Sequence, residues 1–136
     1  MQPETARDFL KAALQRLATA EAIFETLRIN LEARYVGGYA VECALKALIL
    51  ERTAEADRPD MLYNLTHGAA SHRKEVLLGK LRDLGIRLDP ELAGRMRRFD
   101  WDTNLRYETG RLDTGETRAL LRTAKMICDW SGGQIR

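Results

Sequence analysis

Two charged residues, Glu42 and Lys46, interrupt an otherwise apolar stretch of sequence that runs from Tyr39 to Leu50. They are four positions apart with the acid first, so on a helix they are neighbours on one face in the favoured order. On a surface such a pair contributes a few tenths of a kcal/mol, whereas in a core each charge costs several kcal/mol to desolvate unless it is well partnered. We therefore expect the pair either to lie on the one solvated stripe of a buried helix or to serve a functional site.

A second group of candidate residues precedes the last predicted helix, where Trp101 is followed by Arg106 and Tyr107. One hypothesis places all of these residues in a single ligand-binding cleft, in which Lys46 and Arg106 face a phosphate and Glu42 holds one of them in place. The alternative is structural, with Glu42 and Arg106 forming a buried salt bridge that pins this segment to the apolar helix. Both hypotheses can hold together, because an orienting ion pair often lines a site.

Three arginines close together in the sequence, Arg95, Arg97 and Arg98, are candidates for binding nucleic acid. Guanidinium groups donate charge-assisted hydrogen bonds to phosphates, and Trp101 offers a ring on which a base can stack. The alternatives are a solvated helix face for the arginines and a place in the core for Trp101.

The sequence predicts no metal site and no cofactor. His67 and His72 have no cysteine or third histidine near them to complete a zinc site. The segment from Asp100 to Asn104 resembles the start of a calcium loop, but the turn glycine is missing and Arg111 stands at the twelfth position in place of Glu. Neither a phosphate-binding glycine loop nor a Ser/His/Asp or Cys/His arrangement is present.

The elements that position these residues are predicted to be helices. Leu, Ala, Arg and Glu dominate, the chain has 3 prolines in 136 residues, and no β-branched run occurs. We predict one all-α domain over residues 1–136, a compact bundle of about five helices built on a long antiparallel helical hairpin. The predicted helices are 3–28, 31–52, 71–84, 90–99 and 114–130, with an exposed loop at 53–60. Their predicted end signals are Pro3 in a first turn, Asn30, Asp89 and Asp113 as N-caps (the last in a capping box with Glu116), and Gly85 as a stop.

Two adjacent glycines, Gly37 and Gly38, lie within the second predicted helix. Each costs a helix interior roughly 1 kcal/mol relative to Ala, so their presence indicates close approach by another group. That group is a neighbouring helix, a second subunit or a ligand.

Charge and hydropathy narrow the functional classes. The net charge is +2, with 8 basic and 10 acidic side chains in residues 1–71 and 14 basic and 10 acidic in residues 72–136. This asymmetry permits a polyanionic partner for the second half. The start of the chain lacks a secretory signal pattern and no run of eighteen apolar residues occurs, so we expect a cytoplasmic protein that does not span a membrane. Cys43 and Cys128 are expected to be small core residues.

Several of these residues together resemble a HEPN domain, a helical bundle of prokaryotic toxin–antitoxin and defence systems. The resemblance rests on G-G-Y-A-V-E-C-A-L-K-A-L-I-L at residues 37–50, a later histidine-bearing segment, and W-x-x-x-x-R-Y at residues 101–107. It covers the chain from Phe9 to Trp130. It implies a long antiparallel hairpin packed against shorter helices, often in a homodimer, and a small nucleotidyltransferase as one class of partner.

Many members of that family are metal-independent ribonucleases, whose motif is an Arg followed by a His with four to six residues between them. The present sequence departs from this pattern. Arg58 is the nearest arginine before His67, with eight residues between them, and no histidine follows Arg98 or Arg106. Our leading hypothesis is therefore a non-catalytic HEPN-type module that binds a nucleotide, RNA or a nucleotidyltransferase partner.

Two other hypotheses stay open. The first is an RNA-cleaving enzyme with a different site, built from Arg106, Tyr107 and either His67 or His72. The second is a structural dimerisation unit.

Overall fold

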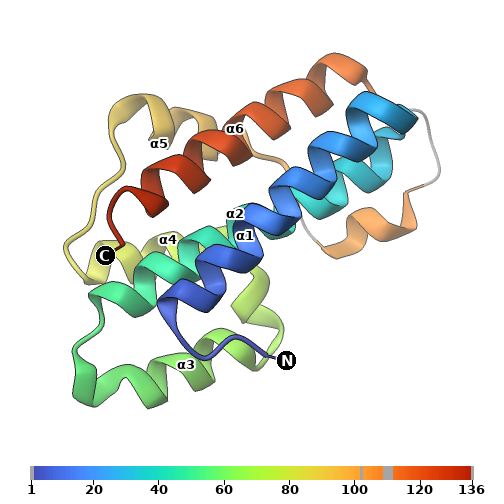
Figure 1. Cartoon of the computed structure of the whole chain (residues 1–136). Coiled ribbons are helices and arrows are strands. Elements are labelled where there is room, and N and C mark those ends of the chain that lie inside the picture. Colours follow the sequence, from blue (N-terminus) through green and yellow to red (C-terminus); the bar gives the residue numbers. More distant parts are fainter. Residues whose placement is uncertain (1, 102, 109–111, 136) are drawn as a thin grey trace.

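The structure is a computed structural model that describes residues 2–101, 103–108 and 112–135, apart from the side chains of Thr103 and Arg106. The described residues form helices and contain no strand, which confirms the predicted all-α bundle (Figure 1). The α-helices are α1 (Ala6–Ala22), α2 (Asn30–Arg52), α3 (Arg58–Thr66), α4 (Lys74–Asp83), α5 (Pro90–Arg97) and α6 (Thr114–Gly132). A π-helical turn (Ile23–Leu27) continues α1, and 3-10 turns span Glu55–Asp57, Ala69–His72 and Thr103–Tyr107.

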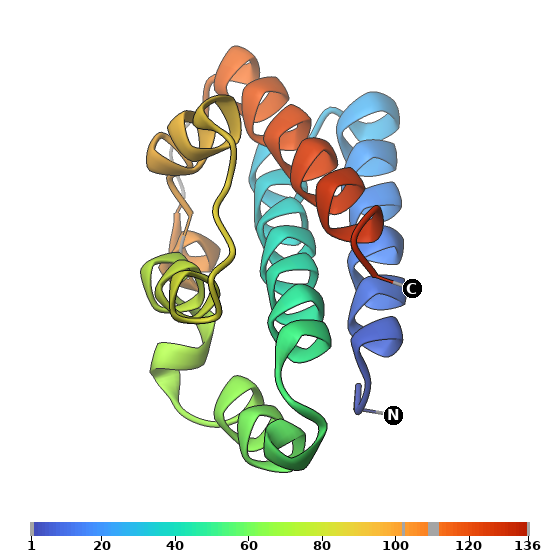
Figure 2. The ribbon, with the colours of Figure 1, turned by 90° about the vertical axis from the view of Figure 1, so that its left-hand side faces the viewer.

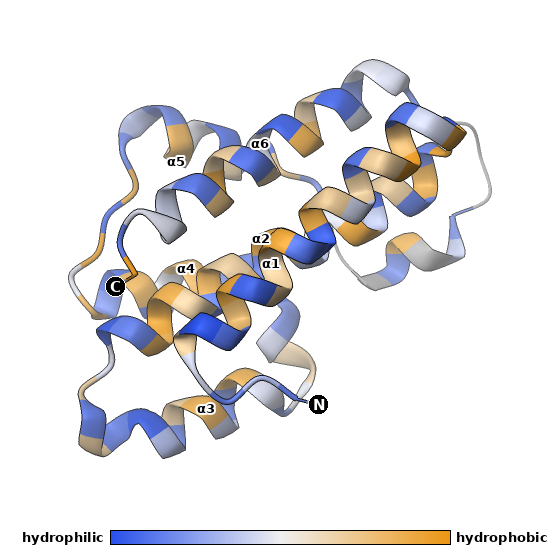
Figure 3. Ribbon diagram, in the orientation of Figure 1, coloured by the Kyte–Doolittle hydropathy of each residue, from blue (hydrophilic) through white to orange (hydrophobic). Residues whose placement is uncertain are grey.

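Helix α2 occupies the centre of the bundle. It packs along α1 as the second arm of an antiparallel hairpin, against α6 on a second side and against α4 on a third (Figure 2). Thirteen of its residues are buried, and they are distributed around the helix rather than along one stripe. A helix that is apolar on all sides is a buried one, so the sequence pattern and the position of α2 agree. The hydropathy colouring shows orange residues on the inner faces of the helices around it (Figure 3).

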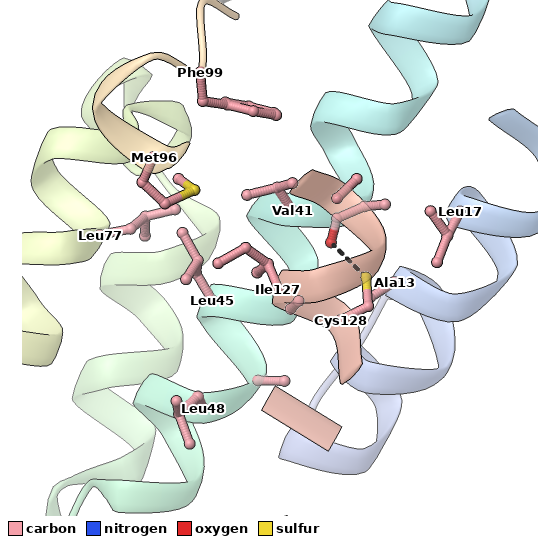
Figure 4. Close-up of a cluster of buried hydrophobic side chains, with 14 of the residues drawn as sticks. Ala13, Leu17, Val41, Leu45, Leu48, Leu77, Met96, Phe99, Ile127 and Cys128 are labelled. Carbon is pink, nitrogen blue, oxygen red and sulfur yellow. Dashed lines mark hydrogen bonds between the residues drawn. The ribbon is translucent and has the colours of Figure 1, made fainter. Parts of the chain in front are cut away.

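The core is continuous across all of these helices. Leu45 and Val41 of α2 meet Leu77 of α4 on one side and Ile127 of α6 on the other (Figure 4). Cys128 is buried beside them, where its Sγ lies 3.9 Å from the carbonyl oxygen of Ala40.

The starts of the first two helices differ from the predictions. Helix α1 begins at Ala6 rather than near Pro3, because Thr5 and Asp8 form a capping box that fixes the start there. Helix α2 has Ile29 as its N-cap. The side chain of Asn30 instead donates to the carbonyl oxygen of Leu112, so it ties α2 to the start of α6.

The predicted loop 53–60 is wrong in its second half, since α3 begins at Arg58 and accommodates Pro59 in its first turn. Proline at the start of a helix lacks only an N–H that would be unpaired there, so it favours a helix start as well as a loop. With α3, the described residues contain six α-helices where about five were predicted.

Three other end signals are confirmed in part or in full. Gly85 ends α4 with a φ of 79°, and the side chain of Asp89 accepts a hydrogen bond from the Leu92 N–H at the start of α5. Asp113 caps α6 through the Gly115 N–H, but Glu116 lies 3.6 Å from Arg34. None of the helices in the described ranges is long and apolar enough to cross a membrane.

The two glycines of α2 serve contacts inside the chain. A Cβ on Gly37 would lie 2.8 Å from Leu121 Cδ2 of α6, and a Cβ on Gly38 would lie 2.1 Å from the Trp101 ring. Of the three partners predicted for them, the structure therefore shows packing between segments of one chain. The expected homodimer gains no support from these residues.

Candidate functional site

Glu42 lies at the centre of a three-residue polar network in the interior of the bundle. Lys46 Nζ donates to Glu42 Oε2 at 3.0 Å, and His72 Nδ1 lies 3.0 Å from Glu42 Oε1. The side chains of Glu42 and Lys46 are only 7% and 6% exposed, whereas that of His72 is 42% exposed. Helix α2 supplies the ion pair, and the 3-10 turn before α4 supplies the histidine, which reaches the pair from the surface.

This geometry determines what each side chain can do. An ionised carboxylate only accepts hydrogen bonds, so Nδ1 of His72 is the donor to Glu42. That assignment leaves Nε2 as the ring nitrogen that does not contact Glu42, on a side chain that is partly exposed. Lys46 is buried with its charge directed at Glu42, which favours the structural hypothesis for Lys46 over an open phosphate contact.

An aromatic cluster adjoins the network on the same helix. The rings of Tyr39 and Trp101 meet edge to face with centroids 4.9 Å apart, and Tyr35 meets Tyr39 in the same manner at 5.1 Å. Tyr39 also meets the His72 ring edge to face at 6.5 Å. Such contacts contribute about 0.5–1.5 kcal/mol each beyond the area they bury, so the cluster holds His72 and Trp101 in place.

Trp101 lies directly against the backbone of Gly38, which is the contact that its predicted core role requires. Its Nε1–H is buried and has no hydrogen-bond partner among the described residues. A donor in that state costs about 1–3 kcal/mol, so the apolar contacts of the ring must offset it. Stacking of Trp101 on a base stays a prediction.

The other two residues of the predicted cleft are only partly accounted for. The 3-10 turn that contains Arg106 and Tyr107 packs against α2, so its backbone lies beside the helix that carries Glu42. Tyr107 is 69% exposed. The side chain of Arg106 lies outside the described residues, and its predicted pairing with Glu42 stays a prediction.

The predicted arginine group lies on α5, where two of its members line a cavity of about 390 Å³ between α2, α5 and α6. Arg95 lines it from α5, Arg98 lines it from the residue that follows α5, and Arg34 lines it from α2. Arg34 is positioned by Nε donating to Thr117 Oγ1 at 2.7 Å and by Nη2 donating to the Asp113 carbonyl oxygen at 2.6 Å. The cavity therefore brings together three guanidinium groups from two helices.

Charge in this cavity is incompletely balanced. Its acidic lining residues are Asp100 and Glu116, and Glu116 is paired with Arg34. Arg95 Nε forms an ion pair with Glu91 Oε1 at 3.6 Å, which is too long for a hydrogen bond, so its buried Nε–H has no hydrogen-bond partner in the described part of the chain. Arg98 makes no ion pair there.

Arg97 and Arg98 extend over the small residue Gly94. Nη2 of Arg97 and Nη1 of Arg98 are each 3.6 Å from the position that a Cβ on Gly94 would occupy. Two like charges so close repel each other unless an anion lies between or beside them. Both side chains are exposed, so solvent weakens that repulsion.

The surroundings of His67, Cys43 and Cys128 indicate structural rather than catalytic roles for these residues. His67 stacks on Tyr63 with centroids 3.9 Å apart and an angle of 15°. Burial raises the pKa of the Cys43 thiol to about 11, with a further contribution from the charge of Glu42, and burial raises the pKa of Cys128 to about 12. Neither thiol is therefore a nucleophile at neutral pH. Groups of three or more metal-ligand side chains are absent from the described residues.

Sequence analysis missed the Glu42–His72 pair and the role of Arg34. His72 follows Glu42 by 30 positions, and no local pattern links the two. Arg34 stands near the start of α2, where an arginine is unremarkable in composition. Only the packing of α4 and α6 on α2 gives these residues their partners.

Comparisons of the chain with family models, with curated proteins and with solved structures find no match.

Proposed function

We propose that the chain is a non-catalytic HEPN-type binding module for a nucleotide or RNA, and that the phosphates bind in the cavity lined by Arg34, Arg95 and Arg98. The observation that carries the proposal is the unpaired donor capacity in that cavity. The buried Nε–H of Arg95 has no hydrogen-bond acceptor within the described residues, its ion pair being with the exposed carboxylate of Glu91 at 3.6 Å, and Arg98 makes no ion pair there. A phosphate oxygen satisfies both groups and adds charge-assisted hydrogen bonds.

The surroundings of the cavity support a phosphate rather than a carboxylate side chain of the same protein. Arg34 is held by the start of α6, so its guanidinium is already oriented when a ligand arrives. Arg97 lies beside Arg98 but does not line this cavity, so it adds only to the positive field around it. A ligand with several phosphates, such as RNA or a nucleoside triphosphate, uses more of this charge than a single anion does.

The test is a binding titration of labelled single-stranded RNA, with ATP as competitor, at two salt concentrations. Arg98→Ala should weaken binding. It should also reduce the slope of the logarithm of the binding constant against the logarithm of salt concentration by about 1 in magnitude, as expected when one phosphate contact is lost. The matched control is Arg16→Ala, which removes an exposed arginine from α1. If the parent binds neither RNA nor ATP, or if both variants weaken binding equally, the cavity is not the phosphate site.

The resemblance to HEPN domains also motivates three proposals about context: a cytoplasmic location, a homodimer, and a nucleotidyltransferase-type partner in a toxin–antitoxin or defence system. A partner of that kind is tested by co-purification with the product of the neighbouring gene.

A second candidate function is RNA cleavage at His72, and it is favoured by the hydrogen bond from His72 Nδ1 to the buried Glu42. This bond fixes the tautomer in which Nε2 can accept the proton of an RNA 2′-hydroxyl. The 2′-oxygen would then attack the adjacent phosphorus, and the 5′-oxygen would leave and take a proton from water. The leading proposal predicts negligible cleavage of total RNA, with or without EDTA. Cleavage that disappears in both His72→Asn and Arg106→Ala would establish the second candidate instead.

A further inference from the structure

A wide groove separates α4 from α5. Helix α4 packs mainly on α2, and α5 packs on α6, so the two helices diverge after the turn that joins them (Figure 2). The turn itself is fixed: Gly85 has a φ of 79°, and the Ile86 N–H donates to the Leu81 carbonyl oxygen at 2.9 Å. This pattern is a Schellman ending, which brings Ile86 back against the helix.

The groove has a volume of about 780 Å³ and an aliphatic floor. Leu78 of α4, Leu88 of the connecting turn and Ala93 of α5 are its partly exposed apolar residues, and the buried side chains of Ile86 and Met96 lie beneath them. Lys74 closes one end, since its Nζ donates to the carbonyl oxygens of Met96 and Phe99 at the end of α5. A cation at the carboxyl end of a helix is favourable there, which makes this bridge a stable feature.

Basic side chains surround this apolar floor. Arg82, Arg87 and Arg97 line the groove, are exposed, and make no ion pair within the described residues. Glu75 is the single acidic residue among those that line it. A strongly positive rim around an apolar floor is complementary to a ligand with acidic and apolar faces.

We propose that the α4–α5 groove binds an acidic amphipathic peptide segment of a partner protein, which goes beyond the nucleotide or RNA binding proposed above. Apolar side chains of the segment pack on Leu78 and Leu88, and its carboxylates pair with the rim arginines. An amphipathic helix that lays its apolar face into a groove is a common mode of peptide recognition.

Charge and chemistry favour a peptide over RNA in this groove. Proteins that bind single-stranded nucleic acids stack successive bases on aromatic side chains in a basic groove. The lining of the α4–α5 groove contains no aromatic residue among the described ones. Its floor instead matches leucine-like side chains in size and polarity.

The test uses the full chain and fluorescein-labelled helical peptides of about four turns. The probe peptide carries Leu on one face and Glu on the other. One control peptide has Ser in place of Leu, and a second has Lys in place of Glu. We expect the parent to bind the Leu/Glu peptide at least tenfold more tightly than either control.

Two variants locate the binding site. Arg82→Glu combined with Arg87→Glu should weaken binding of the Leu/Glu peptide at least tenfold and strengthen binding of the Leu/Lys peptide. Leu78→Gln should weaken binding of the Leu/Glu peptide without this change in charge preference. The matched controls are Arg16→Glu and Leu14→Gln on α1, with circular dichroism to verify folding, and both should bind as the parent does.

Three results contradict the proposal. The first is equal affinity of the parent for the Leu/Glu and Ser/Glu peptides. The second is displacement of the peptide by RNA together with loss of RNA binding in Leu78→Gln, which makes RNA the occupant. The third is a dimer in light scattering that the double charge reversal dissociates, which makes a second copy of the chain the occupant.

Discussion

Replacing Glu42 by glutamine is expected to destabilise the protein by about 3–5 kcal/mol, the cost of leaving one charge of a buried ion pair without its partner. The stranded group is Lys46, whose side chain is 6% exposed and donates to Glu42 at 3.0 Å. At that burial, solvent does little to screen or solvate the ammonium group. Glutamine keeps the size of the side chain, so the loss of charge is the main change.

The variant Lys46→Met removes the other charge of the ion pair and so separates the contribution of Lys46 from that of His72. Lys46→Met strands Glu42, but His72 Nδ1 still donates to Glu42 Oε1. A hydrogen bond to a charged group contributes about 1.5–3 kcal/mol. Lys46→Met should therefore cost less than Glu42→Gln, by roughly that amount.

The double variant Glu42→Leu/Lys46→Met removes both charges of the ion pair. Replacing a whole buried ion pair by apolar residues of similar size is often neutral or stabilising, so we expect the double variant to be more stable than Glu42→Gln alone. The assay is urea unfolding followed by circular dichroism, with midpoint and slope compared for all four proteins. Changes within about 0.5 kcal/mol for both single variants, as for an ordinary surface substitution, would show that the pair is solvated and refute the reasoning.

Three further predictions concern packing, thiols and assembly. Gly38→Ala should cost about 1–3 kcal/mol in urea melts, since its Cβ would overlap the Trp101 ring, and Gly37→Ala should cost less, because it meets only the mobile ends of leucines. With thiol pKa values raised to about 11 and 12, Cys43 and Cys128 should resist iodoacetamide at pH 8 in the folded protein and react in urea. Because the unfolded thiols, with a pKa of about 8.5, lose their protons before the folded ones, this contribution to stability is complete below that pH and is lost as the pH rises toward 11–12. Urea melts at pH 10 should therefore give a lower free energy of unfolding than melts at pH 8. Light scattering should give about twice the 15.5 kDa chain mass if the expected homodimer forms, and a monomer peak would refute it.

The sequence was sufficient for the fold class and for the central role of α2. A stretch in which Glu42 and Lys46 are the only charges between Tyr39 and Leu50 requires burial on nearly all sides, and the structure provides it. Residues that mark helix ends gave correct predictions where they are compatible with only one local structure, as at Asp89. They failed at Pro59, because proline is compatible with both a loop and the first turn of a helix.

The candidate site was harder to predict because its partners are distant in the sequence. The pairing of Glu42 with Lys46 follows from helical spacing alone, whereas the pairing of Glu42 with His72 depends on how α4 packs against α2. The cavity of Arg34, Arg95 and Arg98 likewise depends on the contact between α5 and α6. Side-chain type identified Arg95 and Arg98 but not Arg34, and only the tertiary contacts show that the three lie together.

Helix α5 connects the two proposed binding regions. Arg98 lines the cavity shared with α2 and α6, while Arg97, its neighbour in sequence, lines the groove shared with α4. The helix spans only Pro90–Arg97 and is held mainly by α6 and by the bridge from Lys74, so a ligand on either side acts on the same short element.

Coupling between binding sites is reciprocal. If a phosphate in the cavity changes the affinity of the groove for an acidic peptide, the peptide must change phosphate affinity by the same factor. Because both regions are basic, neutralising one also weakens the positive field at the other, so this electrostatic part of the coupling is negative and decreases with salt.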